Sequence, residues 1–291
     1  MKKNKSSVFI LLGQSNAVGH GIPMKPKDYI QKPLKNVFGL SRKFNQSFSN
    51  TNLYWSGYTS FDMNLAEEQD NTYSLSNCLA SLWQKEINSN NKHSLPNLYI
   101  IQIAIGAQGV TEKFMWNPKR TQKLIPGKLS EVNISLFPFT KHIFSLLDES
   151  FKNKGEDYEI IGIHWRGGEE DITASRFELA NLKSIYEEIF EEFSNQLNSP
   201  PIILHKLLCF DRAKDLDPKG DFLNNLHYVN KVFNSLASEH KNICIFDVSK
   251  APYYKSNIRT NGIYIEDAVH YTPEINKWVA NEILKNYCNK K

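Results

Sequence analysis

Short apolar runs alternate along the chain with longer segments in which apolar residues recur every three or four positions. The short runs are rich in β-branched residues, and several are apolar on both faces, which is typical of strands buried inside a parallel sheet. They lie at 7–12, 98–105, 158–165, 201–210 and 243–248, with a less regular one at 36–40. We predict a strand for each of the six.

The segments between these runs predict helices, because their apolar residues form stripes at helical spacing. One stripe consists of Leu75, Cys78, Leu79, Leu82 and Trp83. A second consists of Phe177, Leu182, Ile185, Tyr186, Ile189 and Phe193. The last helix is expected to begin with Thr272 as N-cap and Pro273 at its first position. It should bury Ile275, Trp278, Val279 and Ile283.

Strands separated by helices indicate βαβ units, and therefore an α/β fold with a central, mostly parallel sheet. No internal repeat, low-complexity tract or linker divides the 291 residues, so we predict one domain over 1–291, with its core at about 7–285. Two irregular stretches, at about 41–73 and 110–140, follow predicted strands. We expect them at the carboxyl edge of the sheet, where ligands bind in open α/β folds.

Composition and charge narrow the function. The chain is 41% hydrophobic and 23% charged, with a formal net charge of +4. Lysine and arginine are interspersed with acidic residues, which does not favour nucleic-acid binding. The apolar run Val8–Leu12 is shorter than a secretory signal requires, and no run suggests a membrane span. We therefore expect a cytoplasmic protein without membrane association; the pattern gives no indication of oligomeric state.

Four cysteines lie far apart in the chain, at Cys78, Cys209, Cys244 and Cys288. No C-x-x-C spacing suggests a metal site, and most of them lie within apolar segments. We expect buried free thiols in a reducing compartment rather than a disulfide framework or a zinc site.

A polar turn, "GQSN" at 13–16, directly follows the first predicted strand. Gly, Ser and Asn are ordinary turn residues, so a purely structural role is one interpretation. The other is that Ser15 is a nucleophile displayed at the carboxyl edge of the sheet. A serine hydroxyl needs a neighbouring base to take its proton, and histidine is the side chain best suited to that role near neutral pH.

The segment "EDAVHYTPE" places Asp267 three residues before His270, just ahead of the last predicted helix. In a turn, the Asp carboxylate can hold the imidazole in the tautomer that accepts a proton from serine. Both residues could instead simply punctuate the start of the helix. The pairing with the Ser15 turn favours the catalytic interpretation.

Two further segments follow predicted strands. In "AIGAQGV" at 104–110, Gly106 or Gly109 could present a backbone N–H to a developing oxyanion, although each could equally be a turn glycine. In "IHWRGGEED" at 163–171, a polar turn follows an apolar strand. A helix-entry loop would explain its glycines and acidic residues, but not its adjacent Trp and Arg.

Together these segments resemble the SGNH hydrolase superfamily. Within it they resemble the branch of sialate O-acetylesterases and acetylxylan esterases, which includes family six carbohydrate esterases. That branch has the motifs G-Q-S-N, G-G-T-x-I-x-x-W, W-x-Q-G-E-S-D and D-x-x-H. The corresponding residues here are Gly13 to Asn16, Gly109 to Trp116, Trp165 to Asp171, and Asp267 with His270. The motifs keep the family order over about residues 7–285.

The resemblance implies a flavodoxin-like three-layer α/β/α sandwich and a serine esterase that removes O-acetyl groups from a carbohydrate, such as a sialic acid-like or other O-acetylated glycan. It implies Ser15 as nucleophile, His270 as general base and Asp267 as its orienting partner. The N–H groups of Ser15 and Gly109 would form the oxyanion hole. It implies no metal or other cofactor. Residues expected to support the site or the substrate are Gln14, Asn16, Arg166, Gly167 and Glu169.

Two positions depart from the family pattern. Val110 replaces the second glycine of G-G-T, and Gly167 stands where the family has Gln, so a side-chain oxyanion donor is missing. Losing one such donor typically lowers turnover by about 10²–10³. Arg166 is expected to lie on the surface without a ligand, or alternatively to pair with a substrate carboxylate. The alternatives are an O-acetyltransferase using the same acetyl-enzyme, or a weakened carbohydrate-binding homologue.

Overall fold

Seven strands form one sheet in the order β3-β2-β4-β1-β5-β6-β7. The computed structural model describes residues 5–20, 29–67, 72–89, 95–120 and 135–289. The strands are β1 (Lys5–Gly13), β2 (Val37–Leu40), β3 (Trp55–Gly57), β4 (Leu98–Ala104), β5 (Asp157–Arg166), β6 (Ile202–His205) and β7 (Ile243–Phe246). All neighbouring pairs are parallel except β2 with β3.

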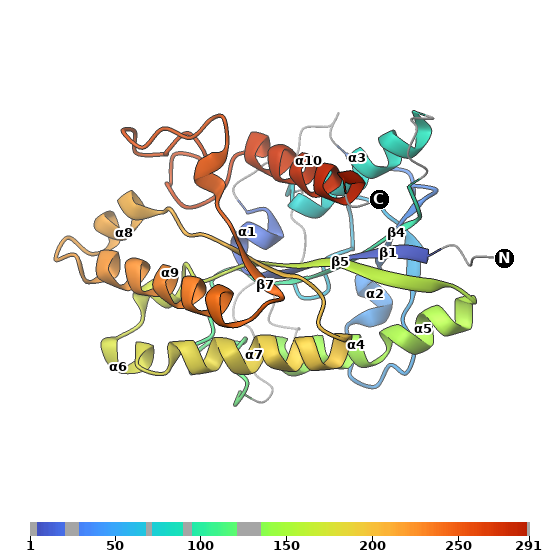
Figure 1. Ribbon diagram of the computed structural model, residues 1–291, viewed down its shortest axis with the longest axis horizontal. Helices are drawn as coiled ribbons and strands as arrows, with labels where there is room; N and C mark the ends of the chain where they lie inside the picture. The colour runs from blue at the N-terminus through green and yellow to red at the C-terminus, as the bar shows by residue number, and fades with distance from the viewer. Residues whose placement is uncertain (1–4, 21–28, 68–71, 90–94, 121–134, 290–291) are drawn as a thin grey trace.

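Helices cover both faces of this sheet. They are α1 (Ser15–Val18), α2 (Arg42–Asn45), α3 (Leu75–Asn88), α4 (Leu136–Ser145), α5 (Leu147–Lys154), α6 (Arg176–Leu179), α7 (Leu182–Leu197), α8 (Phe210–Leu216), α9 (Asp221–Glu239) and α10 (Pro273–Asn289). Helices α3 and α10 lie side by side on one face, and α4, α5, α7 and α9 lie on the other (Figure 1). The predicted α/β arrangement in three layers is confirmed.

The strand order locates the position where a ligand would bind. Strands β4-β1-β5-β6-β7 follow the flavodoxin-like order 2-1-3-4-5, and β2 with β3 extends the sheet beyond β4. In such sheets, ligands bind outside the carboxyl ends of the strands, where the winding direction reverses. Here that position lies between β1 and β5. The segments that follow these two strands contain Ser15 and Glu169.

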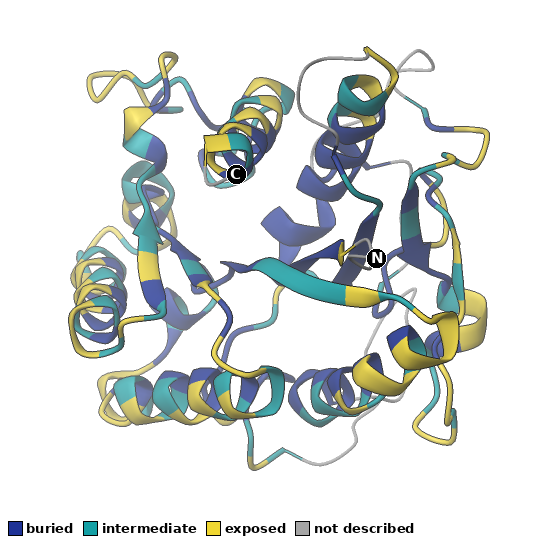
Figure 2. Cartoon of the chain, turned by 45° about the vertical axis from the view of Figure 1, so that its right-hand side comes forward, coloured by how far each residue is buried: buried dark blue, intermediate teal, exposed yellow. Residues whose placement is uncertain are grey.

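Strand β1 is the centre of the sheet because its apolar run suits burial on both faces. Val8 to Leu12 are fully buried, and β1 pairs with β4 on one side and β5 on the other. Figure 2 shows the buried interior of the sheet against the exposed outer sides of the helices. The predicted strands at 7–12, 98–105 and 158–165 are confirmed with small changes at their ends.

The predicted strand at 201–210 is too long. Strand β6 ends at His205, whose partner Phe246 is the last residue of β7, so no neighbouring strand continues the ladder. The side chain of Asn230 instead satisfies the backbone of Leu207, donating to its carbonyl oxygen at 2.8 Å and accepting its N–H at 3.0 Å. The chain then enters α8 at Phe210.

The second helical stripe contains one wrong residue. Phe177 lies in the separate short helix α6 and is 87% exposed. A capping box between Ser175 and Glu178 starts this helix, and α7 begins only at Leu182. The predicted start of the last helix is consistent with the structure, since Thr272 Oγ1 accepts the N–H of Ile275 at 3.4 Å.

The two irregular stretches hold more regular structure than expected. The stretch 41–73 contains α2 and β3, and helix α4 begins within 110–140. Residues 68–71 and 121–134 of these stretches lie outside the described residues. Helices α4, α5, α8 and α9 were not among the predicted helices.

The cysteine expectation is confirmed in part. None of the four thiols is part of a disulfide within the described residues, and Cys78 and Cys209 are buried, but Cys244 is exposed and Cys288 half-buried. Cys244 is exposed because β7 is an edge strand of the sheet. Among the described helices, none combines the length and the apolar character needed to cross a membrane.

Candidate active site

A sharp turn at the end of β1 presents Ser15. Gly13 has φ +136°, and Ser15 is the first residue of α1. The N–H of Gln14 donates to the carbonyl oxygen of Arg166 at 2.9 Å, which ties the turn to the end of β5. A Cβ at Gly13 would lie 2.0 Å from that same carbonyl oxygen. Only glycine fits the turn, because both the φ angle and the close approach exclude a side chain.

Replacing Gly13 by alanine is therefore expected to lower the free energy of unfolding by about 2–4 kcal/mol, measured by urea denaturation. A matched control is Gly155→Ala, where φ is +68° but nothing lies within 4 Å of the added Cβ. That variant carries backbone strain alone, so its loss should be about 1–2 kcal/mol. Equal losses in the two variants would contradict the role of the close approach.

Asp267 and His270 form an imidazole–carboxylate pair. His270 Nδ1 lies 2.6 Å from Asp267 Oδ2. Asp267 Oδ1 accepts the N–H groups of Val269 at 3.0 Å and His270 at 2.9 Å. Partial burial raises the pKa of Asp267, but these hydrogen bonds together outweigh it and hold the pKa below its usual value. An ionised carboxylate keeps the hydrogen on Nδ1 and leaves Nε2 as a proton acceptor.

The side chain of Asn16 joins the Ser15 turn to the His270 loop. Its Nδ2 donates to the carbonyl oxygen of Val269 at 2.9 Å, and its Oδ1 accepts the N–H of Tyr271 at 3.0 Å. Nδ2 also donates to Glu169 Oε1 at 2.7 Å. Asn16 thus bonds to both neighbours of His270 and to the segment after β5. It brings together segments that are more than 100 residues apart in the sequence.

Replacing Asn16 by alanine should remove this connection. We expect the free energy of unfolding to fall by about 2–4 kcal/mol, because three hydrogen bonds are lost and buried partners stay unsatisfied. Amide hydrogen exchange at Tyr271 should accelerate in the same variant. The exposed Asn281, which bonds only within α10, gives the control Asn281→Ala. Unchanged exchange at Tyr271 would show that Asn16 does not hold the loop.

The expectation for Arg166 is wrong. Its side chain is 1% exposed, so it is neither a surface residue nor available to a substrate carboxylate. Its guanidinium donates to Asn276 Oδ1 and, at 3.4 Å, to the carbonyl oxygen of Asn16. Its Cζ lies 5.0 Å from the centroid of the Tyr271 ring. Arg166 therefore packs under the Ser15 turn and the start of α10.

The other support residues also lie around the turn. Gln14 is buried, and its Oε1 accepts the N–H of Glu170 at 3.4 Å. Gly167 is buried, and a Cβ added there would lie 3.2 Å from the indole nitrogen of Trp165. Burial raises the pKa of Glu169, and the hydrogen bond from Asn16 opposes that rise. The carboxyl of Glu169 contacts Asn16 rather than the imidazole of His270 in the recorded hydrogen bonds.

The loop after β4 lies against the same turn, since Trp116 Nε1 donates to the carbonyl oxygen of Gly13 at 3.0 Å. Gly109 in this loop is buried, and a Cβ there would lie 2.3 Å from Asp171 Oδ1. That oxygen accepts the N–H of Val110 at 2.8 Å, and burial raises the pKa of Asp171 to about 6. The Gly109 N–H has no recorded hydrogen bond within the described residues.

Gly106, the other oxyanion candidate, has its N–H occupied by a carboxylate oxygen of Glu67 at 2.5 Å. Glu67 also contacts His20, whose imidazole lies beside that of His270. Neither Glu67 nor His20 was among the site residues predicted from the sequence. The position of His20 five residues after Ser15 was a usable signal, but nothing near Glu67 in the sequence indicates a site.

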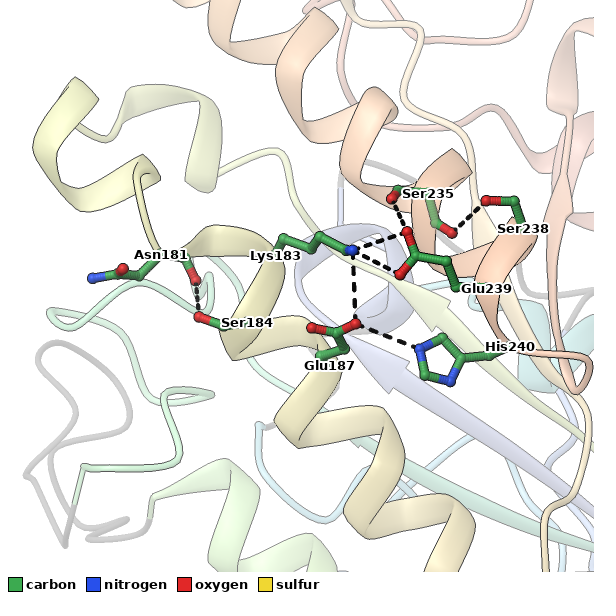
Figure 3. A network of polar contacts seen from close by, with 8 residues as sticks. All are labelled: Asn181, Lys183, Ser184, Glu187, Ser235, Ser238, Glu239 and His240. Carbon is green, nitrogen blue, oxygen red and sulfur yellow. Dashed lines mark hydrogen bonds and ion pairs between the residues drawn. The ribbon is translucent and has the colours of Figure 1, made fainter.

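A possible metal-binding group lies elsewhere. Within the described residues, Glu187, Glu239 and His240 place one potential ligand atom each within 4.8 Å of one another. Lys183 already supplies a cation there, with its Nζ 2.7 Å from Glu239 Oε2 and 3.8 Å from Glu187 Oε1 (Figure 3). The group joins α7 to the end of α9, and both helices lie on the face of the sheet opposite to α3 and α10.

No family model and no curated protein sequence matches the chain. Solved structures do. A protein from Arabidopsis thaliana has a TM-score of 0.58 at 16% identity, covering 99% of this chain and 98% of that one. NanS has a TM-score of 0.59 at 14% identity, covering 99% of each chain. A carbohydrate acetylesterase from Xanthomonas citri has a TM-score of only 0.47 at 12% identity, covering 95% of this chain and 54% of that one. The first two similarities show a shared fold.

Proposed function

We propose that this chain is a serine esterase of the SGNH hydrolase superfamily that removes O-acetyl groups from a carbohydrate. The observation that carries the proposal is the Asp267–His270 pair, 2.6 Å apart and joined to the Ser15 turn through Asn16. The proposed substrate, an acetyl ester of a carbohydrate, comes from the resemblance of the sequence motifs.

In the first step, His270 Nε2 takes the proton of Ser15 Oγ while that oxygen bonds to the carbonyl carbon of the acetyl group. The carbonyl oxygen becomes an oxyanion, and the N–H groups of Ser15 and Gly109 are its proposed donors. The Ser15 N–H is unpaired within its helix because it lies at the first position of α1. Asp267 stabilises the imidazolium that forms.

The tetrahedral intermediate then collapses. The C–O bond to the sugar breaks, the sugar oxygen takes the proton from His270, and an acetyl group remains on Ser15 Oγ. Water enters, gives a proton to His270 Nε2 and attacks the acetyl carbon. Acetate leaves as Ser15 Oγ recovers its proton. The catalytic residues are thus Ser15 and His270. Asp267 positions the imidazole and stabilises its charged form.

Arg166 takes no part in substrate binding in this proposal, because it is buried. Its burial removes the one residue-based reason to favour an acidic sugar. The substrate class is therefore an O-acetylated carbohydrate in general, with sialic acid-like glycans as one member to be tested.

The test is acetate release from a panel of O-acetylated sugars, which includes acetylated xylosides and an O-acetylated sialic acid, together with p-nitrophenyl acetate. In parallel, a fluorophosphonate probe should add its mass to the peptide that contains Ser15. Release of acetate with labelling of Ser15 supports the esterase. Acetyl transfer to an added sugar in place of hydrolysis would indicate the O-acetyltransferase. Sugar binding without labelling or turnover would indicate a binding protein.

A further inference from the structure

A second imidazole–carboxylate pair lies beside the first. His20 Nε2 is 3.0 Å from Glu67 Oε1, and the rings of His20 and His270 meet edge to face with their centroids 6.2 Å apart. The His20 side chain is 33% exposed, whereas that of Glu67 is largely buried. Neither residue has a role in the steps proposed above.

The pair is held from both sides. The His20 backbone N–H donates to the carbonyl oxygen of Ser15 at 3.0 Å, so the residue is anchored to the Ser15 turn. Glu67 Oε2 accepts the N–H of Gly106 at 2.5 Å, which anchors the carboxylate to the end of β4. A Cβ at Gly106 would lie 2.5 Å from His20 Cε1, so glycine is what admits the imidazole there. As in Asp267, one carboxylate oxygen accepts backbone N–H while the other contacts an imidazole.

The arrangement determines which ring nitrogen of a neutral His20 carries the hydrogen. An ionised carboxylate can only accept, so in that state the hydrogen lies on Nε2, toward Glu67. The other ring nitrogen, Nδ1, is then an acceptor, and no contact recorded among the described residues occupies it. The His20 side chain is partly exposed beside His270, and Nδ1 lies over Gly106, where an added Cβ would be only 2.9 Å away. An acceptor in the space that this glycine leaves suits a donor on the substrate, and the donor that carbohydrates carry in abundance is the hydroxyl group.

We propose that His20 is a specificity-determining residue, which accepts through Nδ1 a hydrogen bond from a free hydroxyl group near the acetylated oxygen of the substrate. The inference rests on the proposed esterase function and narrows its substrate class to partially acetylated polyhydroxy compounds. Aryl acetates and fully acetylated sugars have no such hydroxyl and gain nothing from His20. The hydroxyl is bound and not consumed.

Two substitutions distinguish hydroxyl recognition from a purely structural role, in which His20 only holds the Ser15 turn through its contact with Glu67. In His20→Gln, the side-chain amide can still donate to Glu67 at the position of Nε2, but the acceptor at the position of Nδ1 is lost. In His20→Asn, the amide oxygen can occupy the position of Nδ1, while the contact with Glu67 is lost. A purely structural role predicts that Gln preserves activity better than Asn, whereas hydroxyl recognition predicts that Asn preserves it better than Gln.

The control is His240→Ala. His240 also faces a glutamate, with its Nε2 3.6 Å from Glu187 Oε1, but this pair joins α7 to the end of α9 and includes no residue of the Ser15 turn (Figure 3). It reports what the loss of a partly exposed imidazole–carboxylate pair does to the protein in general.

The kinetic test compares p-nitrophenyl acetate, a fully acetylated methyl xyloside and a mono-acetylated methyl xyloside. For His20→Gln, we expect KM for the mono-acetylated sugar to rise about tenfold at similar kcat, with the other two substrates within about twofold of wild type. His20→Asn should show a smaller rise, and His240→Ala none. Equal losses on all three substrates, or a larger loss in Asn than in Gln, would overturn the proposal.

A binding measurement keeps the inference separate from the esterase proposal. The Ser15→Ala protein with ¹⁵N-labelled imidazoles is titrated with methyl xyloside, which carries hydroxyls and no ester. A shift of the His20 Nδ1 resonance, with weaker binding in a Ser15→Ala, His20→Gln double variant, supports hydroxyl recognition even if the wild type releases no acetate. In that case only the proposed esterase function fails. Absence of a shift at saturating xyloside contradicts the His20 proposal itself.

Discussion

Replacement of Ser15 by alanine is expected to lower kcat for acetate release from p-nitrophenyl acetate by about 10³- to 10⁶-fold, with little change in KM. The methyl group of alanine cannot form the acetyl-enzyme, so any residual rate comes from water attack at an intact oxyanion site. In a stopped-flow experiment that follows the absorbance of p-nitrophenolate, the variant should also show no initial burst of product.

A buried serine elsewhere provides the control. Ser76 on α3 is fully buried, and its hydroxyl has no hydrogen-bond partner among the residues that the structure describes. Ser76→Ala should therefore keep the wild-type rate. Equal acetate release by the wild type and Ser15→Ala would remove Ser15 as the nucleophile. Thermal unfolding of both variants establishes that a lost rate does not reflect a lost fold.

The second large effect is expected for Asp267→Asn, which should lower kcat by about 10⁴ while leaving the loop in place. The Asn oxygen can still accept the N–H groups of Val269 and His270. Its amide nitrogen, however, donates toward Nδ1 and so favours the tautomer with hydrogen on Nε2. That tautomer cannot take the proton from Ser15. Because the pKa of Asp267 is held below its usual value, the wild-type carboxylate remains ionised well into the acidic range.

Asp247 offers a close structural match for the control. Its Oδ1 accepts the N–H of Ser249 at 3.0 Å, two residues further along, and its Oδ2 lies 3.2 Å from Lys206 Nζ. Asp247→Asn thus alters the same kind of turn outside the proposed site, and kcat should stay within about twofold of wild type. A comparable fall in both variants would mean that Asp267 acts through the fold rather than through His270.

The parts of the fold that the sequence predicts well are those that depend on local pattern. Strand β1 was predictable because its continuous apolar run fits burial on both faces, and the start of α10 because Thr272 and Pro273 are strong helix-start residues. Strand β6 was predicted too long because its end depends on where its neighbour β7 stops. That information is absent from the sequence of β6 itself.

The same distinction between local pattern and long-range contacts applies to the site. Asp267 and His270 are three residues apart, so their contact could be inferred from a turn, and the structure confirms it. The bonds of Asn16 to Val269 and Tyr271 join segments more than 250 residues apart, and no local pattern encodes them. Arg166 was misassigned because residue type argues for exposure, whereas its place at the end of a central strand and the Tyr271 ring bury it. The catalytic roles of Ser15 and Gly109 stay predictions.

The central position of β1 has a consequence for how the chain reaches its folded state during synthesis. Strand β1 leaves the ribosome well before its second neighbour, β5, which begins only at Asp157. At about 5–20 residues per second, this partner arrives about 8–30 s later. Until then, a strand whose apolar residues 8–12 are fully buried in the finished sheet has an unpaired edge. A segment of this kind is prone to aggregate or to bind chaperones. We expect nascent chains stalled before β5 to bind holdase chaperones through residues 7–12. Chains stalled after β5 should no longer bind them.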